Sequence, residues 1–141
     1  MPAVFCYRHT IEQNEIDGQG HVNNLVYLKW MQEAAIGHSS AQGWPSHRYR
    51  ELGAGWVVRT HTIDYLQPAF ADQQIEVLTW VASFKKIRSE RRYKIVRSED
   101  RQVLAKAATL WAFIDLDNRQ PCRIPRELVE SFQLVSEDAA P

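Results

Sequence analysis

The segment DGQGHVNN, from Asp17 to Asn24, contains the residues whose types and spacing are best suited to chemistry. A carboxylate such as Asp17 can attack an electrophile or remove a proton from water. His21, four residues later, can donate a hydrogen bond or position that carboxylate. Asn24 stands at the predicted start of a helix, where free N–H groups and about half a positive charge favour anions. The segment therefore combines a base or nucleophile with a place where negative charge is stabilised.

Each of these residues also has a purely structural interpretation. Asp17 can form an Asx-turn in a Gly-rich loop, and the DGQG stretch alone favours that interpretation. His21 fits a loop histidine bonded to backbone equally well. Asn23 or Asn24 can cap the helix through its short side-chain oxygen. Catalysis by Asp17 becomes the better interpretation only when HVNN and the apolar helix after it are considered together.

The helix that must position this segment is predicted over residues 24–40. Its apolar residues cover an arc of roughly 200°, about twice the stripe of a surface helix. We therefore expect other parts of the protein to cover most of its sides. Tyr27, Trp30 and Met31 lie on this arc, and core packing is favoured over a ligand pocket for them. Glu33 lies at the edge of the polar arc, where a solvated or interface role is expected.

Five strand-like segments accompany this helix, one before it and four after it. Turn residues separate them, and the short turns indicate antiparallel hairpins. A polar connection is expected over residues 43–55, and a short helix over 125–132, with Pro125 at its first position. The predicted strands cover residues 4–10, 56–66, 75–84, 90–97 and 103–115.

The predicted fold class is α+β. One long apolar helix and one antiparallel sheet can bury each other only if the sheet curls around the helix. The 141 residues are enough for one domain, which is expected to span residues 1–135. The polar tail over residues 136–141 is expected to be flexible.

The overall composition argues against several classes of protein. The 17 Lys and Arg balance the 17 Asp and Glu, so the chain lacks the basic character of a nucleic-acid-binding protein. The N-terminus does not read as a signal peptide, and no apolar run reaches the ~18 residues of a membrane span. A soluble, cytoplasmic protein is therefore expected. Cys6 and Cys122 have no CxxC or metal-ligand spacing, and we expect neither a metal nor a cofactor. The histidines outside the DGQGHVNN segment, which also show no such grouping, are His9, His38, His47 and His61.

The segment from Asp17 to Asn24, followed by Tyr27 and Trp30, resembles the signature of hotdog-fold acyl-CoA thioesterases. The 4-hydroxybenzoyl-CoA thioesterase-like branch is the most similar. IDYLQPA at residues 63–69 resembles the second motif of that group, and RIP at residues 123–125 resembles its C-terminal ending. The resemblance implies a curved antiparallel sheet of about five strands wrapped around a long helix. It also implies homodimers or homotetramers with active sites at the subunit interface.

The same resemblance implies hydrolysis of an acyl-CoA to free CoA and a carboxylic acid. Asp17 would be the nucleophile or general base, and the backbone N–H near Asn24 would polarise the thioester carbonyl. His21 would assist, and no cofactor would be needed. The candidate substrate-binding residues are Asn23, Tyr27 and Trp30.

A basic cluster at one predicted hairpin turn is a candidate site for the phosphates of CoA, which Arg and Lys bind well. The alternative is a solvated turn with ordinary positive charge. The candidate residues are Lys86, Arg88 and Arg91.

Three alternatives remain open. The HVNN residues also resemble plant acyl-carrier-protein (ACP) thioesterases, and the 4-hydroxybenzoyl-CoA type commonly has an aromatic residue at the position of Asn23 or Asn24. That difference argues against a benzoyl substrate and keeps acyl-ACP as an alternative. A hydroxyacyl-thioester dehydratase of the same fold fits less well, because its His-centred motif precedes the helix differently. A non-catalytic acyl-thioester binding protein is the third alternative.

Overall fold

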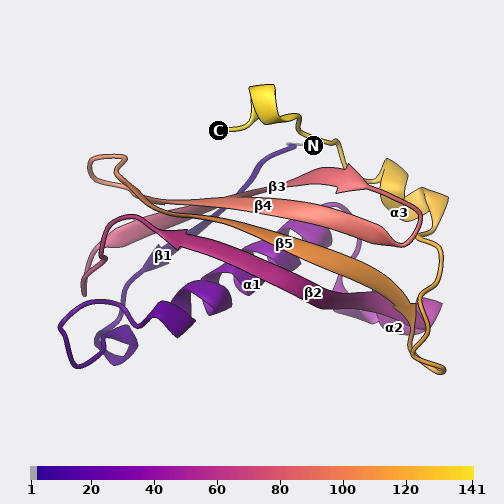
Figure 1. The fold of residues 1–141 in the computed structure, drawn as a ribbon, viewed down its shortest axis with the longest axis horizontal. Coiled ribbons are helices and arrows are strands. Elements are labelled where there is room, and N and C mark those ends of the chain that lie inside the picture. The colour runs from indigo at the N-terminus through magenta and orange to yellow at the C-terminus, as the bar shows by residue number, and fades with distance from the viewer. Residues whose placement is uncertain (1–2) are drawn as a thin grey trace.

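The computed structural model describes residues 3–141 (Figure 1). Its long helix and five strands follow the predicted order, and two short helices and two 3-10 turns join them. The elements are β1 (Phe5–Thr10), η1 (Gln13–Glu15), α1 (Asn24–Ala41), α2 (Ser46–Leu52), β2 (Ala54–Tyr65), β3 (Gln74–Phe84), β4 (Arg88–Arg97), β5 (Val103–Asp115), α3 (Arg126–Glu130) and η2 (Glu137–Ala139).

The five strands form one sheet in the order β1-β3-β4-β5-β2, and every neighbouring pair is antiparallel. The sheet curves over α1, while α2 and α3 lie together at the end remote from the loop that precedes α1 (Figure 1). The consecutive strands β3, β4 and β5 pair through short turns, which confirms two of the hairpins predicted from the turn residues. The hairpin expected between β2 and β3 is wrong, because β2 crosses to the far edge of the sheet and pairs with β5. The predicted α+β class, with a curved sheet around one helix, is also confirmed.

Two short helices differ from the prediction. The connection expected over residues 43–55 contains α2, which begins after Pro45 and ends at Gly53 with φ +78°. The segment SHRYREL has too few apolar residues to show the periodicity that would have indicated a helix. In the structure none of its residues is buried. At the other end of the chain, Pro125 is the N-cap of α3 and not its first helical residue, and α3 ends at Glu130.

The helix α1 begins at a side-chain cap. The Asn23 side-chain oxygen accepts a hydrogen bond of 2.9 Å from the Leu25 N–H, which satisfies one of the free donors of the first turn. One side of the helix is buried, but Leu25 is 72% exposed and Ile36 is 54% exposed. Within this chain the helix is therefore covered on one side only, and the expectation that most of its sides are covered is wrong. Its buried residues are Tyr27, Trp30, Met31, Ala34, Ala35 and His38.

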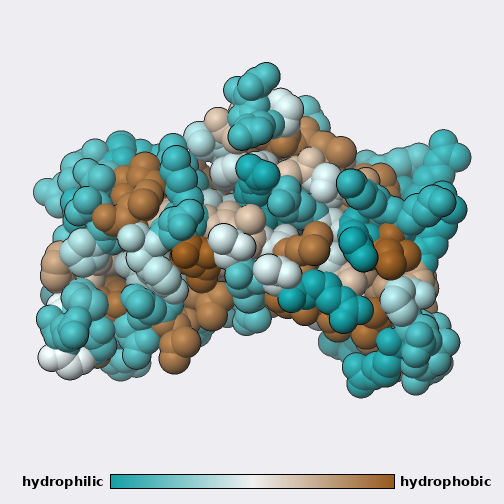
Figure 2. Space-filling model, in the orientation of Figure 1, coloured by the Kyte–Doolittle hydropathy of each residue, from teal (hydrophilic) through white to brown (hydrophobic). Residues whose placement is uncertain are grey.

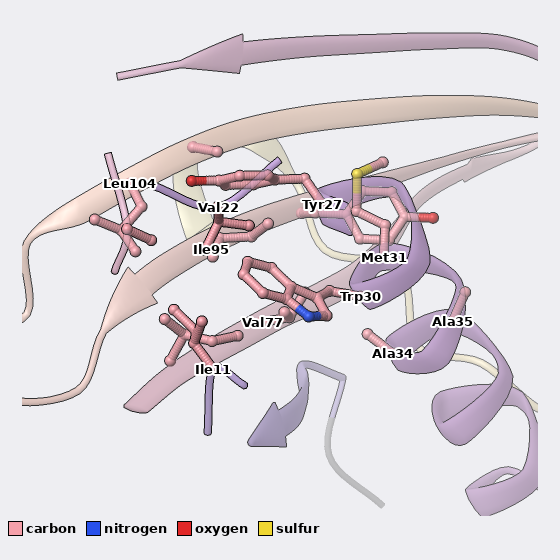
Figure 3. Packing of buried hydrophobic residues seen from close by; sticks show 14 residues of the cluster. Ile11, Val22, Tyr27, Trp30, Met31, Ala34, Ala35, Val77, Ile95 and Leu104 are labelled. Atoms are coloured by element: carbon pink, nitrogen blue, oxygen red, sulfur yellow. The ribbon is translucent and has the colours of Figure 1, made fainter. Parts of the chain in front are cut away.

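Trp30 is the largest fully buried side chain between α1 and the sheet. Its ring extends from the helix towards Val77 of β3 and the Ile11 that follows β1 (Figure 3). An aromatic side chain buries 150–250 Å², so its transfer from water is worth about 4–6 kcal/mol as an upper value. This packing fixes the distance between α1 and the sheet.

The Trp30 indole also makes a polar contact in the core. Its Nε1 donates to Glu15 Oε2 at 3.0 Å, while Glu15 Oε1 lies 2.8 Å from His9 Nε2 and accepts from the Glu12 N–H at 2.8 Å. Burial raises the pKa of Glu15, but the hydrogen bonds from Glu12, His9 and Trp30 outweigh it and hold this pKa below its ordinary value of 4.5. A buried carboxylate therefore remains charged two residues before Asp17, and nothing in the sequence pattern indicated it.

No helix among residues 3–141 is both long enough and apolar enough to cross a membrane.

We predict that Trp30→Phe destabilises the protein by about 1–3 kcal/mol, because it leaves a buried carboxylate oxygen without its donor. Urea denaturation followed by circular dichroism measures the change. Trp80→Phe is the matched control: Trp80 is 5% exposed, and its indole N–H has no recorded acceptor among residues 3–141. Equal losses in the two variants would show that the indole hydrogen bond contributes nothing specific.

We also predict a pH dependence that Glu15 controls. A carboxyl group whose pKa is lowered by folding contributes stability above its unfolded pKa, near 4.5, and loses it as pH falls through the folded pKa. Glu15→Gln should therefore cost most above about pH 5, and the difference from wild type should shrink towards about pH 3. Urea denaturation across this range measures it. A difference that stays constant would contradict the role of the Glu15 charge.

Candidate functional site

Asp17 and His21 lie on opposite sides of a tight turn just before α1. The Asp17 N–H donates to the His21 carbonyl at 2.8 Å, and the Gly20 N–H donates to the Asp17 carbonyl at 3.2 Å. Gly20 has φ +86°, in the left-handed region that glycine adopts without strain. Gly18 does not adopt such a φ, so only one of the two glycines is needed for the turn.

The Asp17 carboxylate is held within this turn. Its Oδ1 accepts a hydrogen bond of 2.8 Å from the Gln19 N–H, and its Oδ2 lies 3.4 Å from His21 Nδ1. The first contact is the Asx-turn expected of a loop aspartate. The Asp17 side chain is nevertheless 27% exposed, and that of His21 is 33% exposed. The carboxylate is therefore oriented by its neighbours and still open to a substrate.

The position of the His21 ring indicates where one of its hydrogens lies. Its Nδ1 faces two oxygen atoms, Asp17 Oδ2 at 3.4 Å and the Val22 carbonyl at 3.3 Å. Both are acceptors, so Nδ1 carries a hydrogen. His21 thus presents an N–H towards the Asp17 carboxylate, which helps to orient it.

Backbone hydrogen bonds attach the turn to the rest of the protein. The Val22 N–H donates to the Ala69 carbonyl at 2.8 Å, and the Asn23 N–H donates to the Glu15 carbonyl at 2.9 Å. Val22 and Ala69 are both buried. The IDYLQPA motif, which ends at Ala69, therefore holds the turn in place against the start of α1.

The first turn of α1 leaves one backbone donor free. Asn23 uses its side chain to satisfy the Leu25 N–H, whereas the Asn24 N–H has no acceptor among the residues that the structure describes. Asn24 is exposed, and its carbonyl accepts a hydrogen bond of 3.0 Å from Tyr65 Oη. The Asn24 N–H can therefore bind an oxygen atom of a ligand at the positive end of the helix.

The other predicted substrate-binding residues are core residues in this chain. Tyr27 is 2% exposed and Trp30 is 1% exposed. Burial, followed by the charge of Tyr65, raises the pKa of Tyr27 to about 12, so its hydroxyl is neutral. The Tyr27 and Tyr65 rings meet edge to face at 5.0 Å, directly behind the first turn of α1. Core packing, the favoured interpretation of this stripe, is what the structure shows.

The basic cluster is divided by the sheet. Lys86 and Arg88 are exposed at the β3–β4 turn, but Arg91 is 6% exposed. Side chains alternate along β4, and Arg91 shares the inner face with Tyr93 and Ile95. The prediction that groups Arg91 with the other two at one surface site is therefore corrected. Lys86 and Arg88 remain candidates for CoA phosphates.

No group of three or more His, Cys, Asp or Glu side chains within residues 3–141 is placed to hold a metal ion.

A curved antiparallel sheet around one long helix is the hotdog fold. The family model of the acyl-ACP thioesterase N-terminal domain matches residues 2–132. The chain therefore belongs to the acyl-ACP thioesterase family, and it is a thioester hydrolase.

Several known proteins are similar to this chain. A provisionally named esterase of Aquifex aeolicus is 29% identical over 126 residues, which is 89% of this chain and 95% of that protein. The 1,4-dihydroxy-2-naphthoyl-CoA thioesterase of Synechocystis has a TM-score of 0.84 at 22% identity, over 91% of this chain and 94% of that chain. A Staphylococcus aureus protein, solved in complex with CoA, has a TM-score of 0.85 at 13% identity, over 91% of this chain and 80% of that chain. These structural similarities show the fold.

Proposed function

We propose that this protein hydrolyses acyl-CoA thioesters, with Asp17 as the catalytic carboxylate and the Asn24 N–H as a donor to the thioester oxygen. One observation carries the proposal. A partly exposed carboxylate and a free backbone N–H occupy the same junction between the turn and α1. The charge that develops on the carbonyl oxygen during attack would be stabilised by that N–H and by the helix dipole.

The carboxylate can act by two routes. As a nucleophile, Asp17 attacks the carbonyl carbon, the C–S bond breaks, CoA leaves as the thiolate and takes up a proton, and water hydrolyses the mixed anhydride. As a general base, Asp17 removes a proton from water while the resulting hydroxide attacks the same carbon. Either route converts one acyl-CoA and one water into a carboxylic acid and free CoA. In both routes the Gln19 N–H and the His21 ring hold the Asp17 carboxylate in place.

The carrier of the acyl group has two candidates. CoA is supported by the Staphylococcus aureus structural neighbour, which was solved with CoA, and by the exposed Lys86 and Arg88. Acyl-ACP is the second candidate, because the matching family model is that of an acyl-ACP thioesterase domain. Truncated thioesters of N-acetylcysteamine, which lack both the phosphates and the protein, provide the reference for comparing the two.

We further propose that the protein forms a homodimer or homotetramer. The twelve-residue strand β2 lies at the edge of the sheet and pairs only with β5 among the described strands. An unpaired edge strand of this length is a site for pairing with another chain. Leu25, Ile36 and Val58 expose apolar surface on α1 and β2, and apolar patches lie between the polar ends of the face seen in Figure 2.

We predict that Asp17→Asn lowers thiol release at least about a hundredfold, because the amide can neither attack the carbonyl nor take up a proton. Thiol release is measured with short, long and aromatic acyl-CoAs and with acyl-ACP. Asp117→Asn, an exposed aspartate in the turn after β5, is the control and should keep the wild-type rate.

An unchanged rate in Asp17→Asn would reject the assignment and direct attention to His21 or Glu33. A wild-type protein that binds acyl thioesters but releases no thiol from any of them would favour the non-catalytic alternative.

We predict that Asn24→Pro lowers kcat by about 10²–10³, because proline removes the N–H proposed to bind the oxyanion. Proline is well tolerated at the first position of a helix. The preceding Asn23, with φ −61° and ψ 132°, already has the extended conformation that proline requires before it.

Asn24→Ala is the matched control, since it removes the side chain and keeps the N–H. Circular dichroism of both variants checks that α1 is intact. Equal kcat values for Asn24→Pro and Asn24→Ala would contradict the role of the backbone donor.

A further inference from the structure

A partly open cavity of about 320 Å³ lies at the other end of α1, lined by that helix, α2 and the sheet. This volume is within the range of small-molecule sites. Ala35 and Ser39 of α1 line the cavity, eleven and fifteen residues after Asn24. At 1.5 Å per residue the cavity is therefore about 17–22 Å along the helix from the Asn24 N–H. Its lining includes Ser46, Tyr49 and Arg50 of α2, and Figure 1 shows α2 at the end opposite the loop that precedes α1.

The walls of the cavity are mainly aromatic, and they come from α2, the strands and the C-terminal segment. Such walls suit the apolar body of a ligand. The aromatic lining residues are Trp44, Tyr49, Trp56, Phe84, Trp111 and Phe132.

A buried cation also lines this aromatic cavity. Arg91 is 6% exposed, and its Nη1 donates to His38 Nδ1 at 2.9 Å and to Thr79 Oγ1 at 3.1 Å. A guanidinium can only donate, so His38 Nδ1 accepts, and its ring is neutral. Thr79 is neutral as well. Its two hydrogen-bond partners, His38 and Thr79, therefore do not neutralise the positive charge of Arg91.

No carboxylate balances Arg91 within residues 3–141. None forms an ion pair with it, and no Asp or Glu lines the cavity. The other cation of the lining, Arg50, is exposed and also has no ion-pair partner in the described part of the chain. A buried charge without a counter-ion is costly to a fold, and a bound anion would remove that cost.

We propose that this cavity is a binding site for an organic carboxylate with an apolar body, whose carboxylate pairs with Arg91. The Nη1 of Arg91 is engaged with His38 and Thr79, and no hydrogen bond is recorded for its Nε or Nη2 in residues 3–141. Those two atoms offer the parallel donors that a carboxylate accepts. A single buried guanidinium neutralises a monoanion, whereas a phosphate monoester brings close to two charges into an apolar cavity. The proposal stands independently of catalysis at Asp17.

Octanoate is a suitable probe, and three tryptophans in the wall give a fluorescence signal. The full-length protein is titrated with octanoate, 1-octanol, octylamine and octyl phosphate, followed by tryptophan fluorescence and calorimetry. Octanoate should bind about tenfold or more tightly than 1-octanol, because the charged hydrogen bonds to Arg91 are made only by the acid. This comparison uses the wild-type chain and stands even if a variant fails to fold.

Arg91→Met locates the site. It should lower octanoate affinity about tenfold or more and leave 1-octanol binding unchanged. Arg92→Met is the matched control, because Arg92 is the next residue of β4, half-buried on the opposite face beside Glu90. Asp17→Asn should also keep wild-type octanoate affinity, which separates this site from the catalytic turn.

The melting temperature gives an independent readout. Arg91→Met removes an uncompensated buried charge, so it should raise the melting temperature of the ligand-free protein, whereas Arg92→Met should not. Equal affinity of the wild type for octanoate and 1-octanol would overturn the proposal. So would octanoate binding that survives Arg91→Met, or that is lost in Asp17→Asn. Tighter binding of octyl phosphate than of octanoate would replace the carboxylate with a phosphate ligand.

Discussion

The buried carboxylate of Glu15 is the contact on which the rest of the structure depends. It joins the Trp30 indole of α1, the His9 ring of β1 and the backbone of the segment that leads to Asp17. Burying a charge is unfavourable, and several hydrogen bonds to one carboxylate offset that cost only if all of them are made together. The helix, the first strand and the turn that carries Asp17 are therefore held in one arrangement before the start of α1.

The helix α1 is long enough to keep the turn that carries Asp17 apart from the cavity that contains Arg91. Its N-terminal end has a free backbone N–H at Asn24 and follows the turn that holds Asp17, the pair on which the proposed hydrolysis rests. Its C-terminal half lines an aromatic cavity that contains the uncompensated charge of Arg91. The two proposed sites therefore lie at opposite ends of one helix, which keeps them apart.

Local signals in the sequence predicted the elements well. The strand over residues 103–115 was predicted with its observed bounds. Asn23, which caps α1 through its side chain, was one of the two residues predicted as the cap, with Asn24. The helix α2 was missed because a short exposed helix has no apolar stripe, and only its Gly53 C-cap distinguishes it from a loop. Arg91 was grouped with surface cations because it is charged and close to the turn, although the alternation of β4 places it on the same face as Tyr93 and Ile95.

The sequence by itself determined the order of elements, the curved sheet packed on one long helix and the turn that carries Asp17, because periodicity, turn residues and motif spacing are local properties. Only the tertiary structure decided which polar groups are buried together. Glu15 meets Trp30 fifteen residues later, and Arg91 meets His38 across fifty-three residues. Such contacts depend on how strands and helix pack in three dimensions, and no spacing along the chain encodes that packing.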